Sequence, residues 1–102
     1  HGDLRKWYMH NTSHWIGLDV HDVGIYKPNG EPRLLEEGMC LTIEPGLYFG
    51  AWRPDVDCPE RYANIGIRIE DDVLVTSGEP DVLTSSCPKT VEEIESITCQ
   101  PF

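Results

Sequence analysis

Residues 65–76, with the sequence IGIRIEDDVLVT, carry the pattern that decides the fold. Apolar and polar residues alternate along the first half of this stretch, with the apolar positions at Ile65, Ile67 and Ile69. A period of two predicts two strands, or one bent strand, with one apolar face. Because Arg68 and Glu70 are two residues apart, they project together from the opposite face.

A further strand is predicted upstream, over residues 39–44 (MCLTIE). Its apolar and β-branched residues favour an extended chain. Pro45 and Gly46 are expected to end the strand, since proline has no amide hydrogen for the ladder and glycine permits a sharp turn. Glu44 therefore closes an apolar strand, as Glu70 does. A carboxylate in that position is costly to bury without a cation or hydrogen-bond donors nearby.

One helix is predicted to begin at Thr90, with Glu93 three residues later in the pattern of a capping box. The apolar positions Val91, Ile94 and Ile97 are spaced to face a core. The other segments are expected to be irregular: a histidine-rich loop with one short extended piece, a turn-rich connection and a long surface loop, over residues 1–24, 26–38 and 51–64. Strands and helix together predict an α+β fold.

The composition is that of one globular domain over residues 1–102, with 39% hydrophobic and 25% charged residues. The net charge is −10, so the surface repels phosphate backbones and anionic headgroups, and we expect no nucleic-acid partner. No signal peptide and no apolar run of membrane-spanning length is evident, so we expect no membrane partner. Part of the acidic charge is expected at a metal site and the rest on a solvated face.

The four cysteines occupy positions 40, 58, 87 and 99 and form no C-x-x-C pair, which argues against a zinc ribbon. Free thiols in a reducing compartment are the simpler interpretation, so we expect an intracellular protein, cytoplasmic or mitochondrial.

The chain begins at His1 and not at an initiator methionine, which suggests a segment of a longer protein; a processed mature chain would begin in the same way.

Three histidines, at positions 10, 14 and 21, fall within twelve residues. Such a cluster is compatible with a structural role in which each imidazole is hydrogen-bonded at a turn. The two strand-end carboxylates also have a simpler explanation, an ion pair with Arg68. Taken together, imidazole nitrogens and carboxylate oxygens form a ligand set that suits Mn²⁺, Co²⁺, Fe²⁺ or Zn²⁺.

Three motifs, in this order and at these separations, carry a resemblance to a known family: HNTSHWIGLDVHDVG (10–24), LTIEPGLY (41–48) and GIRIEDDVLVT (66–76). They resemble the C-terminal part of the catalytic domain of the aminopeptidase P (Xaa-Pro aminopeptidase) family, metallopeptidases of the pita-bread fold. The resemblance runs from about Met9 to Ile97, and residues 85–97 are similar to the tail of bacterial and mitochondrial members. It implies the C-terminal half of that α+β fold, a curved antiparallel sheet with flanking helices.

The resemblance also implies a metal site. His14 and Glu44 correspond to ligands of one metal, and Glu70 corresponds to a carboxylate that bridges two. The family pattern contains two further aspartates and a further histidine upstream, and none of these lies in this chain. The two missing aspartates complete a set of five ligands, so the chain is expected to hold three of the five. Two divalent ions are implied in the complete enzyme, Mn²⁺ foremost, with Co²⁺ or Zn²⁺ as alternatives.

Four further residues match positions on the substrate side of the family's site. His10 and His21 correspond to histidines that touch substrate or support the site, with His21 nearer the peptide. Arg68 and Tyr48 match positions that orient the site or relay protons. Trp15, beside His14, is a candidate for the wall of a proline pocket, although a tryptophan is more often part of a core.

The activity that the resemblance implies is hydrolysis of the bond between an N-terminal residue and a following proline, by a hydroxide activated between two metal ions. The implied partners are a peptide with proline at position 2, the upstream half of the catalytic domain and, for the complete protein, further copies of itself. Two alternatives stay open: a prolidase-like dipeptidase, and a non-catalytic homologue that binds peptides or proteins. The isolated chain is expected to be inactive.

These expectations fix a geometry. The strands over residues 39–44 and 65–76 are predicted to lie in one curved antiparallel sheet, with Glu44 and Glu70 on its concave face. Their carboxylates must lie within about 10 Å of each other, since paired metal ions are about 3.5–4 Å apart.

Overall fold

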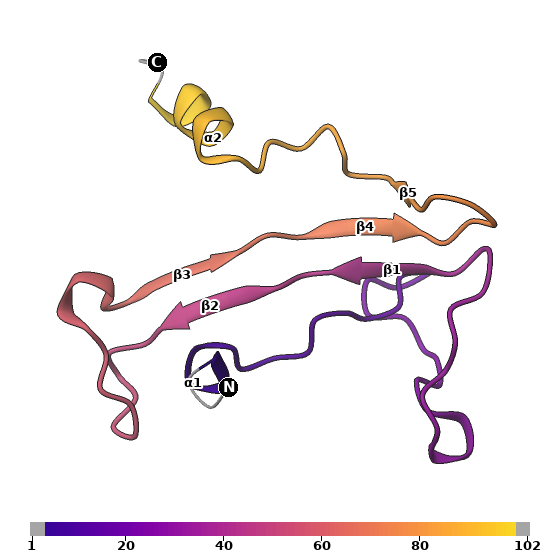
Figure 1. The fold of residues 1–102 in the computed structure, drawn as a ribbon, viewed down its shortest axis with the longest axis horizontal. Coiled ribbons are helices and arrows are strands. Elements are labelled where there is room, and N and C mark those ends of the chain that lie inside the picture. Colours follow the sequence, from indigo (N-terminus) through magenta and orange to yellow (C-terminus); the bar gives the residue numbers. More distant parts are fainter. Residues whose placement is uncertain (1–3, 100–102) are drawn as a thin grey trace.

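The computed structural model describes residues 4–99. The elements are short and follow in this order: α1 (Leu4–Trp7), a 3₁₀ turn (Pro28–Gly30), β1 (Cys40–Ile43), β2 (Gly46–Phe49), a 3₁₀ turn (Glu60–Tyr62), β3 (Ile65–Arg68), β4 (Asp71–Leu74), β5 (Asp81–Val82) and α2 (Val91–Thr98). In Figure 1, β1 and β2 form one long ribbon that runs beside the ribbon of β3 and β4. The α+β class with antiparallel strands is therefore confirmed.

The strands form two antiparallel sheets, one in the order β1-β4-β5 and one of β2 and β3. The pairs that flank the junction are Ile43 with Asp71 and Gly46 with Arg68. One register thus continues through both sheets, and it sets Glu44 opposite Glu70. The prediction of strands on both sides is confirmed, whereas the single sheet is interrupted at this junction.

Pro45 is the reason for the interruption. It lies opposite Ile69, and the pair keeps only the bond in which the Ile69 amide donates to the Pro45 carbonyl (3.1 Å). The reciprocal bond cannot form, because proline has no amide hydrogen. Beyond Pro45 the chain resumes as β2, a strand that was not predicted. Pro45 thus removes one hydrogen bond from the ladder, and the chain continues in the same direction.

Alternation divides the strands into a polar and an apolar face. The polar face presents Thr42, Glu44, Tyr48, Arg68 and Glu70. The apolar face presents Leu41, Ile43, Leu47, Ile67, Ile69 and Val73. Among the described residues, the buried hydrophobic side chains are those of Leu41 and Val73, and the other four members of the apolar face are 40% to 64% exposed. The sheet is therefore only partly covered on that side within residues 4–99.

An extended segment over residues 12–16 lies along the free edge of β1. Amides of β1 and the residue after it donate to this segment, from Thr42 to the His14 carbonyl (3.0 Å) and from Glu44 to the Thr12 carbonyl (2.7 Å). Trp15 forms an antiparallel bridge with Leu41. The short extended piece predicted in the histidine-rich loop is confirmed, and it brings His14 beside the polar face.

The C-terminal segment is fastened to β4 by Lys89. Its ammonium group donates to Asp71 Oδ1 (3.0 Å) and to the carbonyls of Thr84 and Cys87 (both 2.9 Å). All three ammonium hydrogens are thereby used. The hydroxyl of Thr84 and then Lys89 lower the pKa of Asp71. These contacts hold the strand that begins directly after Glu70.

Helix α2 begins with the predicted capping box. The Thr90 hydroxyl accepts from the Glu93 amide (3.2 Å), and the Glu93 carboxylate accepts from the amides of Thr90 (3.0 Å) and Lys89 (3.1 Å). The prediction that α2 faces a core is wrong for the described part of the chain. Val91, Ile94 and Ile97 are 67%, 45% and 58% exposed, and Figure 1 shows α2 standing clear of the strands.

The connections, the first helix and the cysteines complete the fold. Residues 26–38 form the expected exposed connection, whereas α1 was not predicted, since four residues offer little periodicity. Cys40, Cys58, Cys87 and Cys99 are free thiols, as expected. Between residues 4 and 99, the helices are too short and too polar to cross a bilayer.

Candidate metal centre

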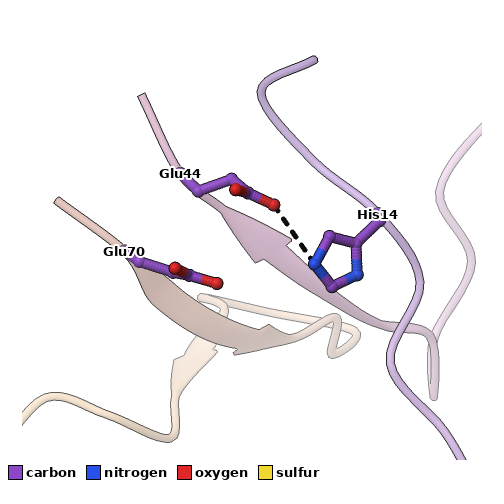
Figure 2. A group of neighbouring side chains, drawn as sticks. All are labelled: His14, Glu44 and Glu70. Carbon is purple, nitrogen blue, oxygen red and sulfur yellow. Dashed lines mark ion pairs between the residues drawn. The ribbon is translucent and has the colours of Figure 1, made fainter. Parts of the chain in front are cut away.

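Three potential metal ligands meet on the polar face. His14, Glu44 and Glu70 each offer one atom, and these atoms lie within 4.8 Å of one another. Figure 2 shows the three side chains converging from the extended segment, the end of β1 and the start of β4. Glu44 is buried, with 9% of its surface exposed. The predicted proximity of the two carboxylates is confirmed.

The sheet register explains why the two carboxylates are close. Hydrogen-bonded and non-bonded pairs alternate along an antiparallel ladder, and Pro45 and Ile69 form a hydrogen-bonded position. The next pair, Glu44 and Glu70, is therefore a non-bonded pair, the kind in which side chains approach most closely. Like charges placed directly opposite each other destabilise a sheet. A cation between them would remove that repulsion.

His14 is oriented as a metal ligand is. Its Nδ1 lies 3.0 Å from the Trp15 carbonyl, which can only accept, so Nδ1 carries the hydrogen. Its Nε2 then faces Glu44 Oε1 at 3.2 Å. A lone pair facing a carboxylate requires a proton or a metal ion between them. Two ligand atoms at about 2.0–2.2 Å from one cation lie roughly 3–3.6 Å apart, so this separation fits a shared ion.

Thr42 links the two ligands and was missed by the sequence analysis. It is the most buried polar residue described, at 2% exposure. Its hydroxyl donates to Glu44 Oε1 (2.9 Å) and accepts from the His14 amide (3.0 Å). Support of this kind holds ligating side chains in one orientation. The available signal was its position two residues before Glu44, on the same strand face.

Arg68 pairs with both carboxylates. Its guanidinium lies 3.0 Å from Glu70 Oε2 and 3.9 Å from Glu44 Oε2. The charge of Glu70, and to a lesser degree the Tyr48 hydroxyl and Glu44, raise the pKa of Arg68. The ion-pair alternative is thus realised alongside the metal-ligand geometry. Arg68 uses the outer oxygens, while Glu44 Oε1 remains directed at His14.

The remaining predicted site residues join the same network. His10 Nδ1 donates to the Asn11 carbonyl (2.6 Å), so its Nε2 accepts from the Tyr48 hydroxyl at 2.9 Å. The rings of His21 and His14 meet edge to face at 4.4 Å. Contacts therefore connect His14, His21, Glu44, Arg68 and Glu70, and the pair of His10 and Tyr48 lies close enough for the Tyr48 hydroxyl to raise the pKa of Arg68. Their individual roles stay predictions.

An open groove of about 840 Å³ borders the ligands. Its lining includes the three histidines, Glu44 and Arg68, together with Asn11, Thr12, Ser13, Tyr26 and Lys27. Trp15, which was considered for a proline pocket, does not line this groove. Its ring stacks on Tyr26 at 5.3 Å with the planes 6° apart, so it fixes the loop beside the site.

Comparison with known proteins agrees with this geometry. Residues 1–77 match Metallopeptidase family M24. The chain belongs to this family. A metallopeptidase of this family requires metal ligands, and the M24 match covers both His14 and the strand pair that carries the two glutamates.

Relatives of this M24 chain are Xaa-Pro aminopeptidases. The Escherichia coli (strain K12) enzyme is 53% identical over 93 residues, which are 91% of this chain and 20% of that protein. Human Xaa-Pro aminopeptidase 3 is 44% identical over 96 residues, 94% of this chain and 18% of that protein. The chain thus spans about one fifth of the length of these relatives.

Solved structures give the same result. The fold matches aminopeptidase P from E. coli with the inhibitor Pro-Leu at a TM-score of 0.82 and 50% identity, covering 95% of this chain and 21% of that one. Pseudomonas aeruginosa aminopeptidase PepP matches at a TM-score of 0.84 and 47% identity, covering 95% and 22%. The chain therefore has the fold of part of these aminopeptidases, the pita-bread fold.

The donor set fits divalent metal ions. Imidazole nitrogen is a ligand of intermediate hardness, and carboxylate oxygens are hard ligands. One imidazole and two carboxylates therefore suit Mn²⁺, Co²⁺, Fe²⁺ or Zn²⁺ and do not favour Cu⁺. The tautomer of His14 leaves Nε2 free to bind, and the buried Glu44 needs a compensating charge beyond the half-exposed Arg68.

Proposed function

We propose that the complete protein is a metal-dependent aminopeptidase that removes the residue preceding proline at the N-terminus of a peptide. The observation that carries the proposal is the convergence of His14, Glu44 and Glu70 within 4.8 Å on the polar face. The relatives that share these strands at 44% to 53% identity are named Xaa-Pro aminopeptidases. A module that only binds peptides has no need for this ligand set.

His14 and Glu44 would hold one divalent ion, and Glu70 would be shared with a second. When bound, such ions, Mn²⁺ foremost, would supply an activated water at neutral pH and Lewis acidity toward a carbonyl. Glu44 and Glu70 keep their spacing because the ladder resumes on both sides of them. Thr42 and the Trp15 carbonyl prevent His14 from turning away.

His21 is placed to serve the transition state. Its ring lies against His14 and lines the groove, so it can donate a hydrogen bond to an oxyanion formed beside the ligands. His10 receives the hydrogen of Tyr48, whose hydroxyl is also close enough to Arg68 to contribute to its raised pKa. This chain of polar groups connects the groove with Glu70 and provides a route for a proton.

The remaining part of the protein has two tasks in this proposal. It supplies further ligands, since three side chains are too few for two ions that repel each other. It also covers the apolar face, where Leu4, Leu47, Phe49, Ile65, Ile67 and Ile69 border a groove of about 510 Å³. Four-fifths of the length of the relatives is available for both tasks.

The test uses the complete protein, stripped of metal and reloaded with Mn²⁺, Co²⁺ or Zn²⁺. We expect hydrolysis of Xaa-Pro-Yaa tripeptides and longer peptides, with little hydrolysis of Xaa-Ala-Yaa. Cleavage confined to Xaa-Pro dipeptides would identify a prolidase-like enzyme. Tight metal binding without hydrolysis of either substrate would identify a non-catalytic homologue.

A further inference from the structure

The groove beside the ligands has an unusual charge for this chain. The protein carries a net charge of −10, yet the lining contains two permanent cations, Lys27 and Arg68, and one carboxylate, Glu44. The three histidines in the lining add no negative charge. Glu70, which pairs with Arg68, balances the second of these cations, so a ligand that enters the groove meets a surface far less acidic than the rest of the molecule.

The two cations differ in whether a carboxylate pairs with them. Arg68 is paired with Glu70 and lies near Glu44. Lys27 takes part in none of the ion pairs of residues 4–99. Its ammonium donors are therefore available to a ligand.

The backbone that carries Lys27 is fixed relative to the metal ligands. Tyr26 stacks on Trp15, and its hydroxyl accepts from the Trp15 amide (3.1 Å). Its carbonyl accepts from the amide of Arg33 (2.8 Å). On the other side, the Gly30 amide donates to the Lys27 carbonyl (3.1 Å) across a 3₁₀ turn. Since Trp15 follows His14 directly, the position of Lys27 is tied to that of a ligand.

Gly24 adds to this arrangement. A Cβ atom at this position would lie 2.4 Å from Cδ1 of the Trp15 ring. The chain can therefore pass closely over Trp15 only because residue 24 has no side chain. The close passage and the stacked pair hold the loop over residues 24–28 against the site.

We propose that Lys27 is a specificity residue that receives the C-terminal carboxylate of short peptide substrates. This inference rests on the proposed function. An aminopeptidase takes the amino end of its substrate at the catalytic centre, so the rest of the peptide extends along the groove at about 3.3–3.6 Å per residue. The one anion that every free peptide carries is at its far end. Lys27 supplies the matching charge.

The experiment compares the complete protein with Lys27→Met and Lys27→Arg variants. Substrates are Xaa-Pro peptides of three, four and five residues, each as the free acid and as the C-terminal amide. In the unaltered protein we expect the acid of at least one length to have a kcat/KM about two- to fivefold above its amide, mainly through KM, as for an exposed charge pair. Lys27→Met should abolish this preference by lowering the kcat/KM of the acid to that of the amide. Lys27→Arg should retain it.

A second readout does not depend on turnover. Calorimetric Kd values for product peptides that begin with proline, acid against amide, should show the same preference and its loss in Lys27→Met. Arg61→Gln, which removes a cation stacked on Tyr62 outside the groove, is the matched control for net charge. An acid preference retained in Lys27→Met, or lost equally in Arg61→Gln, would overturn the role of Lys27 and leave the proposed function standing. Failure of the unaltered protein to cleave any Xaa-Pro peptide would overturn the proposed function, and the inference with it.

Discussion

Replacing Thr42 with valine tests whether the centre depends on support beneath its ligands. Valine has nearly the same shape, so the change removes the hydroxyl and leaves the packing. The hydroxyl donates to Glu44 at 2.9 Å and accepts from the His14 amide at 3.0 Å. Loss of the hydrogen bond to the charged Glu44 costs about 1.5–3 kcal/mol. Leaving the His14 amide without an acceptor costs about 1–3 kcal/mol. With partial relaxation, we expect the free energy of unfolding to fall by about 3 kcal/mol.

The loss of the Thr42 hydroxyl should also weaken metal binding, although the hydroxyl is not itself a ligand. Substitutions behind a ligand typically lower metal affinity about 10- to 100-fold. We therefore expect Thr42→Val in the complete protein to weaken Mn²⁺ binding by a factor in that range, measured by calorimetry on the metal-free protein. Thr42→Ser keeps the hydroxyl and is the control; it should bind Mn²⁺ within about threefold of the unaltered protein.

The two measurements separate support of the site from general stability. Denaturant unfolding of the metal-free protein reports the loss of the hydrogen bonds directly. If Thr42→Val lowered the free energy of unfolding as expected but bound Mn²⁺ as tightly as Thr42→Ser, the hydroxyl would serve the fold and not the ligands. That result would refute the reasoning about Glu44 and His14.

Three further predictions address the ligands, the helix and the isolated chain. Glu70→Gln should abolish peptidase activity and lower metal content by mass spectrometry, whereas His21→Ala should keep the metal and lose turnover; full activity in Glu70→Gln would exclude a bridging role. The Thr90 and Lys89 amides lower the pKa of Glu93, so its stabilisation of α2 is present above the carboxyl's unfolded pKa and is lost as the pH falls through the lower folded pKa; NMR titration of the Glu93 carboxyl should show a pKa below the ordinary glutamate value, and an unshifted titration would contradict the cap. The isolated 102 residues should bind one divalent ion weakly and cleave no Xaa-Pro peptide with added Mn²⁺, since they hold too few ligands; robust activity would show that the ligand count is wrong.

The strands that carry the site were predictable because alternation is a local property. Residues 65–70 alternate so regularly that the faces of Arg68 and Glu70 could be assigned before any pairing was known. Strand β2 was missed because Pro45-Gly46 is a strong signal for the end of a strand. Pro45 does remove a hydrogen bond from the ladder, as the signal implies. The expected sharp turn does not follow, because β2 continues the pairing register of β1.

The composition of the site was predictable only through the family motifs. Nothing in the spacing of His14, Glu44 and Glu70 fixes their separation, which depends on the pairing of β1 with β4 and on the extended segment beside β1. Thr42 was overlooked because threonine is a common strand residue and its burial is a tertiary property. The core-facing prediction for α2 failed because the surface that such a helix would cover is not among residues 4–99.

The strict division of the strands into two faces also restricts how this gene segment can change. Insertion or deletion of one codon within residues 40–49 or 65–74 would exchange the faces of every residue beyond it, turning the ligand glutamates inward and isoleucines toward the groove. Such changes should be eliminated by selection, whereas point substitutions on either face can be tested one at a time. The connections over residues 26–38 and 50–64 carry no such restriction at their tips, because a changed loop length leaves the register of the paired strands intact. Variation in length among homologous genes should therefore fall in connections of this kind, and the number of residues between the start of β1 and Glu44 should be invariant.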